Sequence, residues 1–129
     1  MSTTTQTAVP TQASSLASST AFRTFATVFA IATPIVYVIC EMANWPLFTY
    51  HPGTDRLNLG WAPAVKDEGP AMYWYGWILA TLLGAGALGL AATMLPESLT
   101  RKIPLALTLI MPLVAVPVLI YALRFYWRW

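Results

Sequence analysis

Three long apolar segments, separated by polar stretches, dominate the hydrophobic pattern of this chain. They cover residues 24–42, 71–95 and 103–123. Each provides roughly the 20 apolar residues that an α-helix needs to cross a hydrocarbon core of about 30 Å. The pattern therefore predicts an all-α membrane protein with three transmembrane helices.

The polar loop after the first segment carries a different pattern. Apolar and polar residues alternate on both sides of the turn formers Pro52-Gly53-Thr54-Asp55. Alternation with period two around such a turn is typical of a β-hairpin, here over about residues 46–61, with His51 opposite Arg56. We expect the apolar side chains to face the helix ends or the membrane, and Thr49 and Asn58 to face water. This apolar face comprises Phe48, Tyr50, Leu57, Leu59 and Trp61.

Prolines lie at the start of one predicted helix and inside two others. Pro70 suits the first position of the second helix, where a missing N–H costs nothing. Pro34 lies inside the first helix and predicts a kink, while Pro112 and Pro117 predict an irregular third helix. Without ionisable side chains beside them, we interpret these prolines as bends and not as ion-binding breaks.

Small residues recur every four positions along the second segment. This spacing places them in two sets on helix faces and lets another backbone approach closely. We expect a neighbouring helix of the same chain to pack there, with a helix from another subunit as the alternative. The helix-packing residues are Gly76, Ala80 and Gly84, and Ala85 and Gly89.

Composition supports a membrane protein, because 57% of residues are hydrophobic and only 9% are charged, against about 25% charged in soluble domains. The net charge of +2 is scattered, so we predict no nucleic-acid partner. A single cysteine excludes an internal disulfide.

Residues 1–20 are rich in Ser and Thr and are predicted to be disordered, before a membrane domain over residues 21–129. A mitochondrial transit peptide is the weaker alternative, since no arginine precedes Arg23.

Basic residues are nearly balanced between the two sides of a three-span topology. We favour an integral protein of the bacterial inner (plasma) membrane with a cytoplasmic N-terminus, because the hairpin loop and most acids would then face outward.

Few residues are candidates for catalysis or for binding a ligand or metal. Glu41 is the only carboxylate in or beside a predicted span, and it lies about 27 Å along the helix from Arg23, at the far interface. A solvated or hairpin-bonded carboxylate is the preferred interpretation over a proton or ligand site. Soft sulfur and imidazole ligands suit copper, but their spacing matches no known site, and ordinary packing is preferred. These copper candidates are Cys40, Met42, His51 and Met72.

No motif for catalysis or cofactor binding is found, so no cofactor is predicted, and an enzyme is disfavoured. The leading hypothesis is a non-enzymatic accessory or assembly subunit whose partners are the lipid bilayer and other membrane subunits or copies of itself. The alternative is a protein that binds a quinone, lipid, pigment or metal beneath the aromatic hairpin. Its candidate residues are Glu41, His51, Trp45, Trp61, Tyr73 and Trp77.

Overall fold

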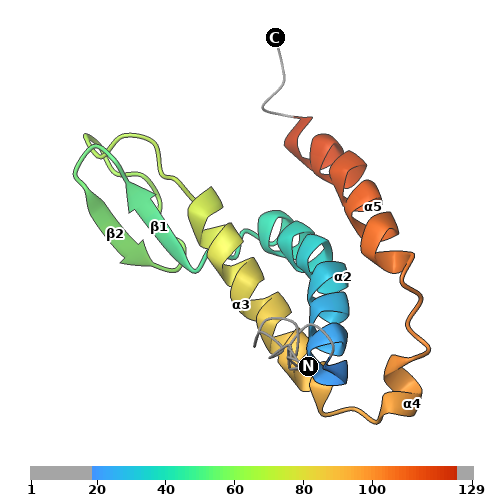
Figure 1. The fold of residues 1–129 in the computed structure, drawn as a ribbon. Helices are drawn as coiled ribbons and strands as arrows, with labels where there is room; N and C mark the ends of the chain where they lie inside the picture. Colours follow the sequence, from blue (N-terminus) through green and yellow to red (C-terminus); the bar gives the residue numbers. More distant parts are fainter. Residues whose placement is uncertain (1–18, 125–129) are drawn as a thin grey trace, which may run out of the picture.

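The computed structural model is mostly helical, with a two-stranded antiparallel hairpin at one end (Figure 1). The structure describes residues 19–124. The predicted N-terminal tail and the aromatic C-terminus, residues 125–129, lie largely or wholly outside that range. In chain order the elements are α2 (Thr20–Met42), β1 (Phe48–His51), β2 (Arg56–Leu59), α3 (Trp74–Thr93), α4 (Glu97–Thr100) and α5 (Leu107–Ala122).

Two helices, α2 with 23 residues and α3 with 20, are long and apolar enough to cross a membrane. The third predicted span is not confirmed, because α5 has only 16 residues. The apolar segment from residue 103 does not become helical at once, because α5 begins only at Leu107. Instead, the N–H groups of Leu107, Thr108 and Leu109 donate to carbonyls three residues earlier, so the chain is wound in tight turns before α5 begins.

The core of the fold lies between α2 and α3, which make the most extensive contact of any two elements. Small side chains allow this approach: a Cβ at Gly89 would lie 2.8 Å from the ring of Phe25, and one at Gly84 would lie 3.2 Å from Val36. Helix α5 packs more lightly on α2 and buries only Ala115. The buried residues of α3 are Gly76, Thr81, Ala85, Gly89 and Ala92.

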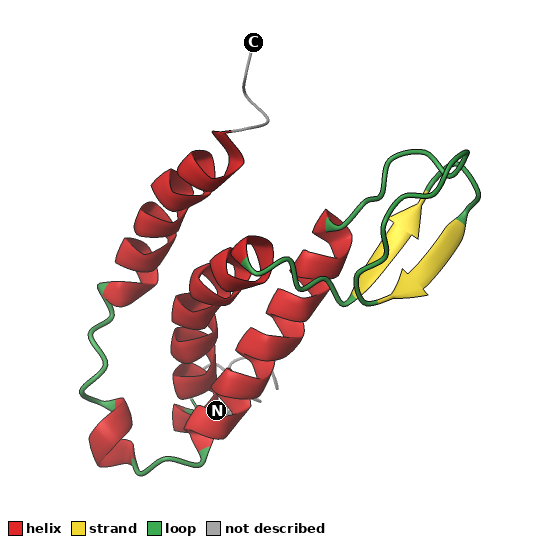
Figure 2. Cartoon of the chain, turned by 180° about the vertical axis from the view of Figure 1, so that it is seen from behind, coloured by secondary structure: helices red, strands yellow, loops and turns green. Residues whose placement is uncertain are grey.

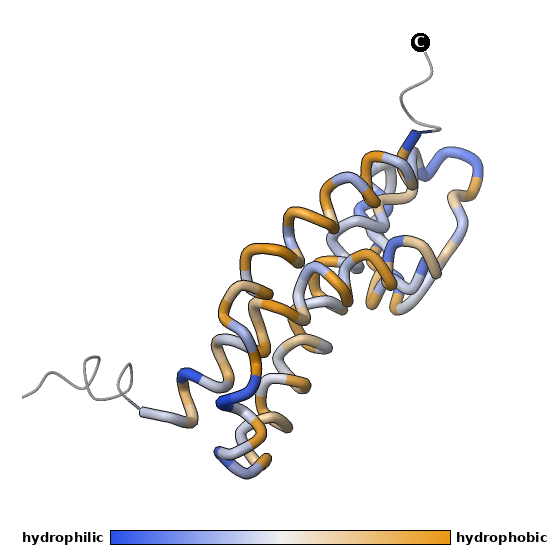
Figure 3. The backbone as a smooth tube through the Cα atoms, turned by 90° about the vertical axis from the view of Figure 1, so that its right-hand side faces the viewer, coloured by the Kyte–Doolittle hydropathy of each residue, from blue (hydrophilic) through white to orange (hydrophobic). Residues whose placement is uncertain are grey.

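Most large apolar side chains of α3 and α5 are exposed. Leu83 and Leu90 of α3 and Leu109 and Leu113 of α5 are all exposed. Figure 3 shows hydrophobic positions along the helices, with strongly hydrophilic ones near α4 and in the hairpin region. A chain in water would place such leucines inside, so this distribution suits an apolar surrounding.

The start of α3 differs from the prediction. Pro70 does not occupy the first helical position, because α3 begins at Trp74. Residues before it remain extended, since Tyr50 and Met72 exchange two backbone hydrogen bonds, of 3.2 Å and 2.9 Å. The hairpin therefore holds this segment as a short additional pairing next to β1.

Candidate functional site

The hairpin between α2 and α3 is present with the predicted register. His51 pairs with Arg56, and the pairing continues to Phe48 opposite Leu59. Alternating residues and a four-residue turn are sufficient to fix this local pairing. The hairpin and its register are therefore confirmed.

The direction in which the hairpin faces was predicted wrongly. Thr49 and His51 are completely buried, with 0% exposure, whereas Leu57 and Leu59 are 59% and 87% exposed. The cause is the segment between β2 and α3, which runs back beside the strands (Figure 2). The Thr49 hydroxyl donates to the Gly60 carbonyl at 2.7 Å and accepts from the Ala62 N–H at 3.2 Å. This polar segment satisfies the polar face and leaves the apolar side chains of β2 outside.

A charged cluster joins the returning segment to both strands. Glu68 accepts a hydrogen bond from Arg56 of β2 at 2.9 Å, and its second oxygen lies 3.5 Å from Nδ1 of His51 in β1. The side chain of Glu68 is only 9% exposed, while that of Arg56 is 62% exposed. Among the described residues neither nitrogen of His51 has a hydrogen-bond partner, so the 3.5 Å approach to Glu68 is not a hydrogen bond. Arg56 is therefore the principal partner of a buried carboxylate.

Gly53 brings the turn of the hairpin against this segment. Its N–H donates to the Glu68 carbonyl at 2.9 Å, and a Cβ at Gly53 would lie 2.6 Å from the same oxygen. Only glycine permits this approach without moving the backbone. Backbone and side chain of Glu68 thus both fasten the segment to the hairpin.

Tyr50 and Asp55 close the other side of the turn. The Tyr50 hydroxyl donates to Oδ1 of Asp55 at 2.7 Å. This hydrogen bond raises the pKa of Tyr50 above its ordinary value of 10.0, because it is lost when the phenol ionises. Its contribution to folding is complete below pH 10 and is lost as the pH rises through the elevated pKa.

Aromatic side chains stack between the hairpin segment and α3. The ring of Tyr73 lies 6.5 Å from that of Trp61 and 6.2 Å from that of Trp77. The Tyr73 hydroxyl also donates to the Ala62 carbonyl at 3.3 Å. Trp45, another candidate residue for the ligand site predicted beneath the hairpin, is exposed. The three stacked rings fix the returning segment on the first turn of α3.

Besides the two nitrogens of His51, two further buried polar atoms lack hydrogen-bond partners among the described residues. One is Oε2 of Glu41, near the end of α2, and the other is Nε1 of Trp77, in the first turn of α3. An acceptor and a donor of this kind are ordinarily satisfied by a water molecule or a ligand.

The copper candidates lie in dissimilar surroundings. Cys40 is buried, while Met42 is 67% exposed. Met72 is held by its backbone bonds to Tyr50. Residues 19–124 contain no group of three or more His, Cys, Asp or Glu side chains that could hold a metal ion.

Sequence reasoning missed the role of Glu68. Neither Asp67 nor Glu68 is among the candidate residues of the sequence, and in the structure Asp67 is exposed whereas Glu68 is buried. The available signal was the pair of acids directly before the break Gly69-Pro70, in a loop that also holds His51 and Arg56 as possible cationic partners.

No protein-family model matches the chain, and neither curated proteins nor solved structures include one that matches it.

Proposed function

We propose that this chain is a small, non-enzymatic membrane subunit that binds a partner protein through the open edge of its hairpin. The apolar helices would anchor it in the bilayer. The hairpin with its returning segment, residues 46–73, would form a cap outside the bilayer, and we call it the cap.

The exposed leucines of the helices support the membrane anchor. A soluble protein that buried α3 as a core helix would cover its large side chains, but Leu83 and Leu90 are exposed. A cleaved signal peptide would not share a packed interface with the next helix, whereas α2 packs along α3. Both observations favour α2 and α3 as retained transmembrane helices.

The single observation that carries the proposal is the outer edge of β2. The backbone N–H and C=O of Tyr50 both form hydrogen bonds with Met72, on the side of β1 away from β2. By antiparallel geometry its partner Leu57 directs its own N–H and C=O away from β1, and Leu59 does the same two residues later. Within residues 19–124 no other strand pairs with this edge. The edge therefore combines unpaired backbone groups with two exposed leucines.

A partner strand suits this edge better than lipid. Backbone N–H and C=O groups need polar partners, which hydrocarbon does not offer, while an added β-strand supplies them directly. Its apolar side chains would meet Leu57 and Leu59 on the same face. An open, apolar edge is otherwise a site of aggregation, so a stable protein keeps it covered.

The use of polar groups within the cap supports a structural role. Arg56 and Glu68 bond to each other, and the hydroxyl of Thr49 bonds to backbone groups of the cap. These side chains hold the returning segment in place.

A photo-crosslinking amino acid at Leu59 is expected to form one discrete protein adduct in intact cells. The reason is that Leu59 would lie against the added strand. The measurement is the mass and peptide identity of the adduct after denaturing purification.

Leu82 provides the matched control, because it is an exposed leucine of α3 that is not part of the cap. The same photo-crosslinker there is expected to capture lipid. Lipid adducts alone at both positions, or the same protein adducts at both, would contradict a partner at the hairpin edge.

We also propose that α5 crosses the membrane with its flanking turns, which gives three crossings in all. Its 16 residues span about 24 Å as a helix, and the tight turns from Pro104 onward add length. Reporter fusions at Met1 and Trp129 are expected to report opposite sides of the membrane. Reporters on the same side would show that α5 does not cross.

A second candidate function, a ligand held beneath the cap, is supported by the unpartnered atoms of Glu41 and Trp77. A carboxylate acceptor and an indole donor would suit a ligand that has both a donor and an acceptor, such as the reduced form of a quinone. The non-protein mass retained by the purified protein distinguishes this function from a purely structural one.

A further inference from the structure

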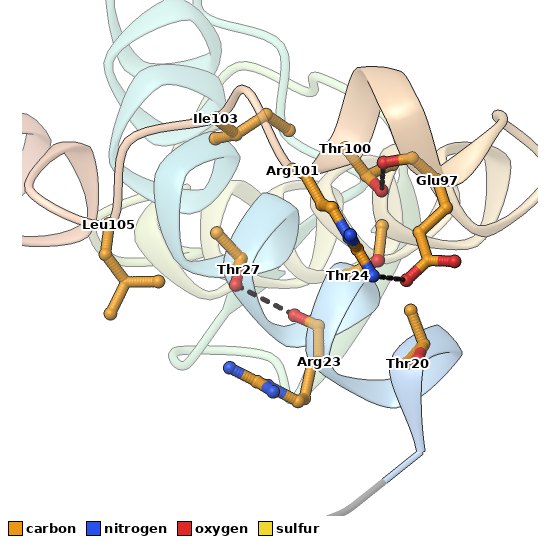
Figure 4. Close-up of a pocket in the computed structure, with 9 residues that line it drawn as sticks. All are labelled: Thr20, Arg23, Thr24, Thr27, Glu97, Thr100, Arg101, Ile103 and Leu105. Carbon is orange, nitrogen blue, oxygen red and sulfur yellow. Dashed lines mark hydrogen bonds and ion pairs between the residues drawn. The ribbon is translucent and has the colours of Figure 1, made fainter.

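A cavity of about 380 Å³ lies at the end of the helices opposite the cap. Its walls come from the first two turns of α2 and from the segment that includes α4 and leads to α5 (Figure 4). Segments far apart in sequence thus meet here, and the sequence pattern of apolar spans did not indicate the cavity.

The polar wall carries a net positive charge. Arg101 is paired with Glu97 at 2.8 Å, so these two charges balance each other. Arg23 also lines the cavity and has no ion-pair partner among residues 19–124. One positive charge is therefore available to an anion.

Hydroxyl groups surround this arginine. Thr27 and Thr100 donate to backbone carbonyls of their own helices. Thr20 and Thr24 also line the cavity, and their hydroxyls have no hydrogen bond within the described part of the chain. A guanidinium with neighbouring hydroxyl donors is a combination that recognises phosphate oxygens.

The opposite wall is apolar, because Ile103 and Leu105 line it. We propose that this cavity binds a phosphate group, with Arg23 and the hydroxyls of Thr20 and Thr24 as its ligands. The apolar wall favours an anionic phospholipid as the source of that group, since Leu105 would contact the acyl chain while the headgroup reaches Arg23. Free phosphate shares the same polar chemistry and would leave the apolar wall uncovered.

This inference goes beyond the proposed partner binding, because it concerns the opposite end of the molecule. It rests on the proposed membrane location, and it is separable from the hairpin edge: loss of lipid binding would leave the Leu59 adduct unchanged.

The test is native mass spectrometry of the full-length protein in micelles that contain equal amounts of phosphatidylglycerol and phosphatidylcholine. The unsubstituted protein is expected to retain phosphatidylglycerol preferentially. Arg23→Gln should lower that retention about tenfold, because glutamine cannot make the charge-assisted hydrogen bonds of a guanidinium to phosphate. Lys102→Gln is the matched control, because Lys102 is an exposed cation beside Arg101 that does not line the cavity. It should change retention less than twofold.

Arg23→Lys and Thr24→Val keep the proposal testable if Arg23→Gln fails to fold. The lysine retains charge but loses the two-pronged geometry of arginine, and the valine removes only a hydroxyl, so both should weaken retention partially. A second arm adds inorganic phosphate to lipid-free protein. Binding of phosphate that depends on Arg23, without a preference for phosphatidylglycerol, would support the site and assign it to free phosphate. Equal retention in all variants, or equal losses from Arg23→Gln and Lys102→Gln, would overturn the proposal.

Discussion

Gly76→Ala is expected to detach the cap from α3 and to lower the free energy of unfolding by about 3 kcal/mol. The added Cβ would overlap the carbonyl oxygen of Phe48 and lie 2.7 Å from Cβ of Pro46. The obstacle at Phe48 is backbone, which cannot rotate away as a side chain does. The Gly76 carbonyl also accepts the N–H of Leu47 at 3.1 Å, so moving the chain would lose this bond as well.

Gly86→Ala is the matched control on the same helix. Apart from its chain neighbours and the adjacent backbone of α3, no atom lies within 4 Å of a Cβ at Gly86, so the substitution meets open space. Alanine is favoured over glycine in a helix by about 1 kcal/mol, and this variant should be neutral or slightly more stable. The same substitution at two positions ten residues apart is thus expected to destabilise the protein at Gly76 and not at Gly86.

Equilibrium unfolding in micelles gives the two free energies, and hydrogen exchange shows where the loss occurs. In Gly76→Ala the amides of Tyr50 and Met72 should exchange faster, because the pairing next to β1 depends on the docked cap. Similar stability of both variants, or unchanged exchange at Tyr50, would show that the cap does not need the close approach at Gly76.

Local patterns predicted the parts of the fold that local physics determines. Apolar length identified α2 and α3, and alternation around the turn at Pro52–Asp55 gave the hairpin register, since each depends on neighbouring residues only. Helix ends were less accurate, because Pro70 satisfies the rule for a helix start while Met72 is held extended by a partner 22 residues earlier.

The orientation of the hairpin could not be read in the same way. Alternation shows that Thr49 and Leu57 belong to opposite faces, but it does not show which face another segment will cover. The rule that apolar faces turn inward fails here, because the returning segment brings Glu68 and backbone donors to the polar face. The cavity beside Arg23 arises between segments that are distant in sequence, so no single stretch contains its signal. Glu68 lies in the same loop as Arg56, but no local pattern pairs the two residues.

Arg56→Gln is expected to destabilise the cap more than Glu68→Gln, although the two residues form one ion pair. Loss of Arg56 leaves the carboxylate of Glu68 buried, with only the 3.5 Å contact to His51, and should cost about 3 kcal/mol. Loss of the charge on Glu68 leaves Arg56 largely in water, where its guanidinium remains hydrated. That change should cost only about 1 kcal/mol.

The double variant Arg56→Gln/Glu68→Gln separates an unpaired buried charge from a general loss of contacts. Its stability should be close to that of Glu68→Gln and greater than that of Arg56→Gln, because the second substitution removes the buried charge that the first one leaves unpaired. Glu97→Gln tests an exposed ion pair for comparison, since Glu97 and Arg101 are 2.8 Å apart and both side chains are exposed. This substitution should lower the free energy of unfolding by about 0.5 kcal/mol or less. Equilibrium unfolding of the four variants measures these differences. If Arg56→Gln and Glu68→Gln cost the same and their effects add, the carboxylate of Glu68 is solvated in solution and the returning segment is held by its backbone and aromatic contacts instead.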